Sequence, residues 1–110
     1  MTVGELRVSG GYELICEGDT NRAVKSVYCG DLLSSVMLKA PRDCAWVTVM
    51  GNINAAAVSF TADAACIVLA ENAEADREML DKAKEYGINV LKTDLPVFEA
   101  ALRIYGQINA

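Results

Sequence analysis

The residues best suited to bind a ligand are small and polar, and each group of them follows an apolar segment. They are Gly30, Asp31, Gly51, Asn52, Asn54, Glu71 and Asn72. A glycine lets the backbone approach a ligand closely, and the free N–H groups at the start of a helix bind anions. The amides of Asn52 and Asn54 would add uncharged hydrogen bonds to a nucleotide or a small acid. The sequence therefore offers these seven as candidate ligand-binding residues.

The same turns also have a purely structural interpretation, which we favour for three of these residues. Gly51 would serve the backbone geometry of its turn, and Asn52 would cap the helix that follows. Asp31 would likewise cap a helix start, where a carboxylate stabilises free N–H groups. Asp63 would belong to the turn before the fourth strand.

Familiar catalytic patterns are missing, so we expect the protein not to be an enzyme. The chain has no histidine, and serine, cysteine and metal hydrolases mostly rely on histidine as a base or ligand. Neither the GxxxxGK(S/T) phosphate loop nor the GxGxxG dinucleotide pattern occurs. The acidic residues from Asp76 to Glu85 would lie on the solvated face of one helix. No catalytic residue is therefore assigned.

The four cysteines do not indicate a metal site or a cofactor. They are Cys16, Cys29, Cys44 and Cys66, and no two are spaced as a CxxC pair. Zinc sites use closely spaced ligand pairs. We expect mostly buried thiols that act as small apolar side chains, with Cys29 as the only thiol that could be exposed.

Length and composition predict a single domain spanning residues 1–110. The chain has a net charge of −5 and is 53% hydrophobic. The charge argues against a nucleic-acid partner and against a polybasic membrane anchor. The apolar run 44–70 is interrupted by Gly51, Asn52 and Asn54, unlike a membrane span of about 20 apolar residues. Charged residues precede any apolar leader segment, so we expect a cytoplasmic protein.

The order of elements predicts an α/β fold. A short helical turn is expected within the first nine residues. Strands are expected at 12–16, 23–29, 44–50, 65–70 and 89–92, and helices at 31–40, 53–61, 74–86 and from 97 onward. Strands that alternate with helices form a mainly parallel sheet, here of about five strands, with helices on both faces. Ligands in such sheets bind beyond the carboxyl ends of the strands, where the candidate turns lie.

The helix at 53–61 is small or apolar on nearly every side, which allows two interpretations. It is either buried within the monomer or forms half of a homodimer interface. We favour the homodimer. The interface would involve Ala55, Ala56, Val58, Ser59 and the surroundings of Trp46.

Three segments resemble the DRTGG domain family. They are YCGDLLSSVM, AWVTVMGNINAAAVSFTADAACIVLAE and YGINVLKTD, and the resemblance spans about residues 10 to 105. It implies the three-layer α/β/α fold of the N-terminal domain of HPr kinase, a regulatory role and dimer contacts. Short stand-alone members tend to be encoded near iron-only hydrogenase genes in anaerobic bacteria. Gly51-Asn52-Ile53 stands where many members have Gly-Asp-Arg, and Ala70-Glu71-Asn72 where many have Thr-Gly-Gly.

The resemblance and the residues together predict a non-catalytic regulatory or ligand-sensing domain. The expected ligand is a small anion or a nucleotide, and the expected setting is hydrogenase or carbon metabolism of an anaerobic bacterium. The alternative is an interaction module that docks onto an enzyme complex without a small-molecule ligand.

Overall fold

The computed structural model describes all residues from Met1 to Ala110 and contains one five-stranded sheet. Its strands are β1 (Glu13–Cys16), β2 (Ser26–Cys29), β3 (Cys44–Thr48), β4 (Cys66–Leu69) and β5 (Val90–Lys92). The strand order is β1-β5-β4-β3-β2. Strands β2 to β5 are mutually parallel, and β1 is antiparallel to β5. The predicted α/β fold with a mainly parallel sheet is confirmed.

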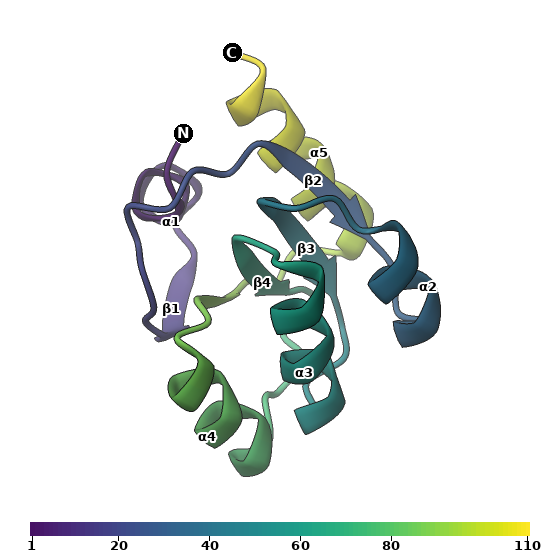
Figure 1. Cartoon of the computed structure of the whole chain (residues 1–110). Helices are drawn as coiled ribbons and strands as arrows, with labels where there is room; N and C mark the ends of the chain where they lie inside the picture. Colours follow the sequence, from purple (N-terminus) through teal and green to yellow (C-terminus); the bar gives the residue numbers. More distant parts are fainter.

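Five helices cover the two faces of the sheet. They are α1 (Val3–Gly10), α2 (Leu33–Lys39), α3 (Ile53–Ala62), α4 (Arg77–Tyr86) and α5 (Val97–Ile108). Each step from β2 to β5 moves to the next strand in the same direction, so right-handed crossovers place α2, α3 and α4 on one face. Figure 1 shows these three helices in front of the sheet and α5 behind it. The molecule is thus a three-layer α/β/α unit.

The core divides into two clusters because strand side chains alternate between faces. Trp46, Ile67 and Leu69 pack toward α2, α3 and α4. Val47 and Val68 pack toward α1 and α5. All five residues are fully buried, as expected for central parallel strands covered on both faces.

The predicted dimer interface on α3 is wrong in its residues. Ala55, Ala56 and Ser59 are buried within the monomer, and so is Trp46. Helix α3 packs between α2 and α4, so the chain itself covers the face that the sequence assigned to a second copy. Val58 is only half-buried.

Several boundaries differ from the prediction for local reasons. Helix α1 is a full helix because Thr2 and Glu5 form a reciprocal capping box at its start. Helix α4 begins at Arg77, since the side chain of Asp76 caps it by accepting from Met79 N. Strand β2 begins only at Ser26. The longest helix, α5, has 12 residues, and none of the helices has the length and apolar character needed to cross a membrane.

Candidate ligand-binding turns and a cavity at the opposite edge

The predicted ligand residues lie together at one edge of the sheet. Gly30 and Asp31 follow β2, Gly51 to Asn54 follow β3, and Glu71 and Asn72 follow β4. Because these strands are parallel neighbours, their carboxyl ends meet at the same edge. We call this set of turns the carboxyl edge.

Asp31 does not cap a helix, contrary to the prediction. Helix α2 begins at Leu33, and its N-cap residue is Leu32, which makes no side-chain cap hydrogen bond. The Asp31 carboxylate instead accepts from Thr48 Oγ1 at 2.7 Å and from Val49 N at 3.0 Å. It therefore links the end of β2 to the end of β3, where the Val49 N–H no longer pairs with a neighbouring strand.

Gly51 has a steric role. A Cβ at this position would lie 1.9 Å from the carbonyl oxygen of Glu74, and the backbone N–H of Asp76 donates to the Gly51 oxygen at 2.8 Å. The turn after β3 therefore packs against the segment that leads into α4. Only a glycine allows this approach, so the structural interpretation of Gly51 is confirmed.

Asn52 caps α3, as expected. Its side-chain oxygen accepts from Ala55 N at 3.1 Å, which leaves the amide NH₂ group free for another partner. Asn54 is exposed on the first turn of α3. The start of this helix therefore presents one amide with a structural role and one without.

The turn after β4 holds two exposed residues in the left-handed backbone region. Glu71 has φ 57° and Asn72 has φ 55°. Their N–H groups donate to Leu95 O at 2.8 Å and to Thr93 O at 3.0 Å, which ties this turn to the one after β5. Non-glycine residues in this region cost of order 1–3 kcal/mol each and are often found at functional sites.

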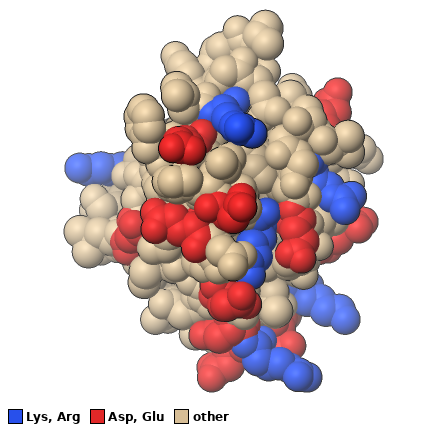
Figure 2. Space-filling view, turned by 180° about the vertical axis from the view of Figure 1, so that it is seen from behind, with Lys and Arg blue, Asp and Glu red and all other residues tan.

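Acidic side chains dominate the carboxyl edge. Asp31, Glu71, Glu74, Asp76 and Asp94 follow the four parallel strands, whereas Lys92 is the basic residue among them. Lys92 Nζ already lies 2.8 Å from the carboxylate of Glu74. On the face opposite that of Figure 1, acidic side chains likewise gather in groups around a few basic ones (Figure 2).

The turns of the carboxyl edge line none of the three cavities in the structure. In doubly wound sheets the ligand crevice opens where the strand order reverses. Here β2 to β5 follow one another without a reversal. The turns after β2, β3 and β4 lead to helices on one face, and the turn after β5 leads to α5 on the other face (Figure 1). Hydrogen bonds tie the turns after β4 and β5 together, and no cavity opens between them.

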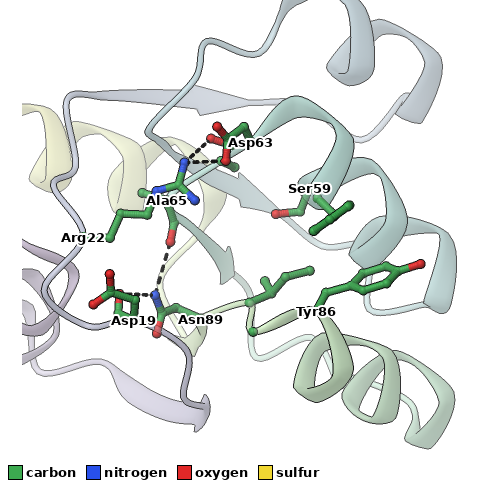
Figure 3. A pocket seen from close by; sticks show the side chains of 11 residues that line it. Asp19, Arg22, Ser59, Asp63, Ala65, Tyr86 and Asn89 are labelled. Carbon is green, nitrogen blue, oxygen red and sulfur yellow. Dashed lines mark hydrogen bonds and ion pairs between the residues drawn. The ribbon is translucent and has the colours of Figure 1, made fainter.

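A cavity of about 180 Å³ lies at the opposite edge, where β4 and β5 begin. The ends of α3 and α4 flank it, together with the loop between β1 and β2. Figure 3 shows the side chains that line it, among them Asp19, Arg22, Ser59, Asp63, Ala65, Tyr86 and Asn89. We call this feature the amino-edge cavity.

Two polar residues hold the walls of the amino-edge cavity in place. Arg22 donates to the carboxylates of Asp43 and Asp63 at 2.9 and 2.8 Å and also to the Asp63 carbonyl. Desolvation works to lower the pKa of Arg22, but the hydrogen bonds that Arg22 donates to the two carboxylates, together with their negative charge, outweigh it and raise this pKa. Asn89 accepts from Gly18 N at 2.7 Å and donates to Asp19 O at 2.9 Å.

Ser59 is the residue of this cavity that sequence reasoning misplaced. Its side chain is 1% exposed, and its hydroxyl finds no hydrogen-bond partner in the protein. In Figure 3 the hydroxyl points into the cavity. Helical spacing puts Ser59 on the same face as Ala55 and Ala56. A hydroxyl on that small-residue face was the signal that could have indicated a polar cavity.

The thiols follow the prediction except Cys16, which is partly exposed because it ends the edge strand β1. Cys29 is exposed, whereas Cys44 and Cys66 are buried. Burial raises the pKa of Cys44 to about 11 and that of Cys66 to about 12. The two buried thiols are therefore protonated at neutral pH and chemically inert.

Comparison with known proteins identifies a similar fold but no family. No protein-family model matches the sequence, and no curated protein sequence matches it. A similar structure is the crystal structure of the CBS and DRTGG domains of the regulatory region of Clostridium perfringens pyrophosphatase, in complex with its activator diadenosine tetraphosphate. The TM-score is 0.68 at 11% identity, over 94% of this chain and 46% of the other.

This likeness confirms the DRTGG resemblance at the level of the fold. The chain spans about half of the regulatory region that it matches. Likeness to the N-terminal domain of HPr kinase stays a prediction.

Proposed function

We propose that the protein is a non-catalytic regulatory domain that senses a small ligand through its carboxyl edge. The observation that carries this proposal is the fold match over 94% of the chain to a regulatory region crystallised with a nucleotide activator. The strained turn at Glu71-Asn72 and the free amide of Asn54 supply exposed groups suited to contact a ligand.

The charge of the carboxyl edge constrains the ligand. Five carboxylates against Lys92 repel a bare polyphosphate. A nucleotide would therefore bind through phosphates that carry Mg²⁺, which one or two carboxylates hold together with the phosphate oxygens. We infer that binding of a nucleotide anion to this edge depends on Mg²⁺.

A thermal-shift screen of ATP, AMP and diadenosine tetraphosphate, with and without Mg²⁺, tests the proposal. We expect at least one nucleotide to raise the Tm in the presence of Mg²⁺. Asn54→Ala should abolish that rise without lowering the Tm of the free protein, because Asn54 is exposed and holds no cap. Asn21→Ala, an exposed asparagine outside the carboxyl edge, is the matched control. Absence of stabilisation by any nucleotide in either condition would contradict the proposal.

We further propose that the domain is a homodimer that uses the outer edge of β2. This strand ends the sheet, and an exposed edge strand presents unpaired backbone groups to a partner. Apolar side chains lie on both sides of it. On α5, Phe98, Leu102 and Tyr105 are 72%, 58% and 54% exposed. Leu32, the N-cap of α2, and Leu38, on α2, are 69% and 82% exposed. Figure 1 shows β2 at the margin of the sheet, with α2 and α5 beside it.

The alternative function is an interaction module, and the same apolar side chains favour it. Phe98, Leu102 and Tyr105 recur at i, i+4 and i+7, the spacing of one helix face that docks into a groove. An enzyme partner could cover this face in place of a second copy. Two results together would support this alternative. The purified protein would be a monomer on its own, and an enzyme would co-purify with the wild-type protein but not with Phe98→Asp.

The metabolic setting is proposed from the resemblance to stand-alone DRTGG domains. We place the protein in the redox or carbon metabolism of an anaerobic bacterium, near an iron-only hydrogenase. Deletion of its gene should then change hydrogen production or its response to carbon source, and an unchanged phenotype in both would count against this setting.

A further inference from the structure

We propose that the amino-edge cavity is a second binding site, specific for a small primary ammonium ion. It lies at the opposite end of the parallel strands from the carboxyl edge. It is therefore separate from the proposed nucleotide site, and each of the two binding proposals can be disproved without affecting the other.

The hydroxyl of Ser59 lacks a hydrogen-bond partner in the protein. This side chain is 1% exposed and lines the cavity. Buried polar groups are nearly always satisfied, and an unsatisfied one calls for an explanation. A helical serine usually donates to a carbonyl one turn earlier, whereas the Ser59 hydroxyl points into the cavity instead (Figure 3). A ligand N–H group there would supply the missing partner.

Two helix ends give the cavity a negative electrostatic potential. Helices α3 and α4 both end at the cavity, at Ala62 and Tyr86. The C-terminal end of a helix carries a partial negative charge and free carbonyl oxygens, which favour cations. Here, capping hydrogen bonds already occupy the carbonyl oxygens of Ser59, Phe60, Ala83 and Lys84. The attraction for a cation therefore comes from the partial negative charge of the two helix ends.

The charged side chains of the cavity leave one carboxylate without a counter-ion. Arg22 is bound by Asp43 and Asp63, Arg42 lies 2.8 Å from Asp63, and Lys25 lies 3.5 Å from Asp43. These two carboxylates are therefore fully paired. Asp19 makes no ion pair, and its carboxylate accepts only from the backbone N–H of Asn21 at 3.0 Å. Asp19 is thus the group available to an incoming positive charge.

The size and the apolar wall define the rest of the ligand. About 180 Å³ is less than the roughly 300–1,000 Å³ of pockets for drug-sized ligands. The rings of Phe60 and Tyr86 stack at 4.4 Å between centroids along one side. This space suits an ammonium group on a short alkyl chain, and it excludes a dinucleotide.

A titration followed by ¹⁵N–¹H correlation spectra tests the site with three probes of matched size. The probes are n-butylammonium chloride, n-butanol and sodium butyrate at constant ionic strength. We expect saturable shifts of the Ala64, Gly87 and Asn89 amides with butylammonium, at least tenfold weaker binding of butanol and none of butyrate. The amides of Asn54 and Asn72 serve as internal controls and should not move.

Two conservative variants complete the test. Ser59→Ala removes the hydroxyl, and Asp19→Asn removes the charge but keeps the acceptor for Asn21 N. Each should weaken butylammonium binding about three- to tenfold, the range expected for one hydrogen bond. Ser34→Ala, an exposed serine on α2, should change nothing. If Ser59→Ala fails to fold, Ser59→Cys, of nearly the same shape, takes its place.

Three results would overturn the proposal. One is the absence of saturable shifts with butylammonium. Another is equal binding of butylammonium and butyrate, which would show that charge is not recognised. The third is an affinity in Ser59→Ala equal to that in Ser34→Ala, which would show that the buried hydroxyl does not contact the ligand.

Discussion

At the scale of single residues, Arg22 is the side chain that contributes most polar contacts. It joins the loop before β2 to Asp43 and Asp63, in the turns that precede β3 and β4. Arg22→Met should lower the free energy of unfolding by about 1–3 kcal/mol, the range for hydrogen bonds to charged groups. Arg77→Met is the matched control, because Arg77 is exposed and its single ion pair, to Asp81, is long at 3.9 Å. It should cost at most about 0.5 kcal/mol. Equal losses in urea unfolding would refute this account of Arg22.

The same ion pair predicts a pH dependence. The hydrogen bond from Arg22 lowers the pKa of Asp43 below its usual value of 3.8. A carboxylate with a lowered pKa in the folded state stabilises the fold above its unfolded pKa, and this contribution is lost as the pH falls through the folded value. The free energy of unfolding should therefore fall below about pH 4. In Arg22→Met this fall should be shallower, and an unchanged slope would contradict the assignment.

The cysteines give a prediction that needs no variant. Cys29 is exposed, whereas Cys44 and Cys66 are buried with raised pKa values. Thiol-specific reagents react with the thiolate form. Ellman's reagent should therefore titrate Cys29 first and Cys16, which is partly exposed, more slowly. Cys44 and Cys66 should react only on unfolding. Four equally fast thiols in the native protein would show that the core opens readily.

For the packing of helices and strands, alanine substitutions at two glycines, one crowded and one not, can be compared. Gly51 lies against the Glu74 carbonyl, whereas a Cβ at Gly106 would have no neighbour within 4 Å. Gly51→Ala should destabilise by at least about 1–3 kcal/mol through overpacking. Gly106→Ala, in helix α5, should stabilise by roughly 0.5–1 kcal/mol through its helix propensity. Urea unfolding measures both, and a neutral Gly51→Ala would show that the contact with the α4 segment is not required.

The elements also show what the sequence could predict. Strands β3 and β4 were predicted correctly, because burial on both faces gives a continuous apolar run. The end of α4 was also predicted correctly, because its left-handed cap favours a glycine. Asp31 was misassigned, because its partners on β3 are 17 and 18 residues away. No local pattern distinguishes a helix cap from a carboxylate that bonds a neighbouring strand.

For the molecule as a whole, the position of the cavity could not be predicted from the sequence. The turns were expected at one edge, and they lie there, but none of them lines a cavity. The cavity at the other edge depends on Arg22, Ser59 and Asn89, which belong to three separate segments. The burial of α3 likewise depends on α2 and α4, so its small residues were mistaken for an interface.

The proposed homodimer is a property of the whole molecule and has its own test. Light scattering coupled to size exclusion should give twice the mass of the 11.8 kDa chain. Phe98→Asp combined with Leu102→Asp should yield a monomer, since it places charge in the exposed apolar face of α5. Arg103→Asp, on the same helix, should remain dimeric. A wild-type protein that is monomeric in this measurement would disprove the proposed homodimer.

Binding of a nucleotide to the carboxyl edge can be tested by amide shift mapping with diadenosine tetraphosphate and Mg²⁺. We expect saturable shifts at Asn52, Asn54, Glu71 and Asn72 that vanish when EDTA removes the Mg²⁺. Shifts confined to residues outside the carboxyl edge, or no shift at all with this ligand, ATP or AMP, would contradict it.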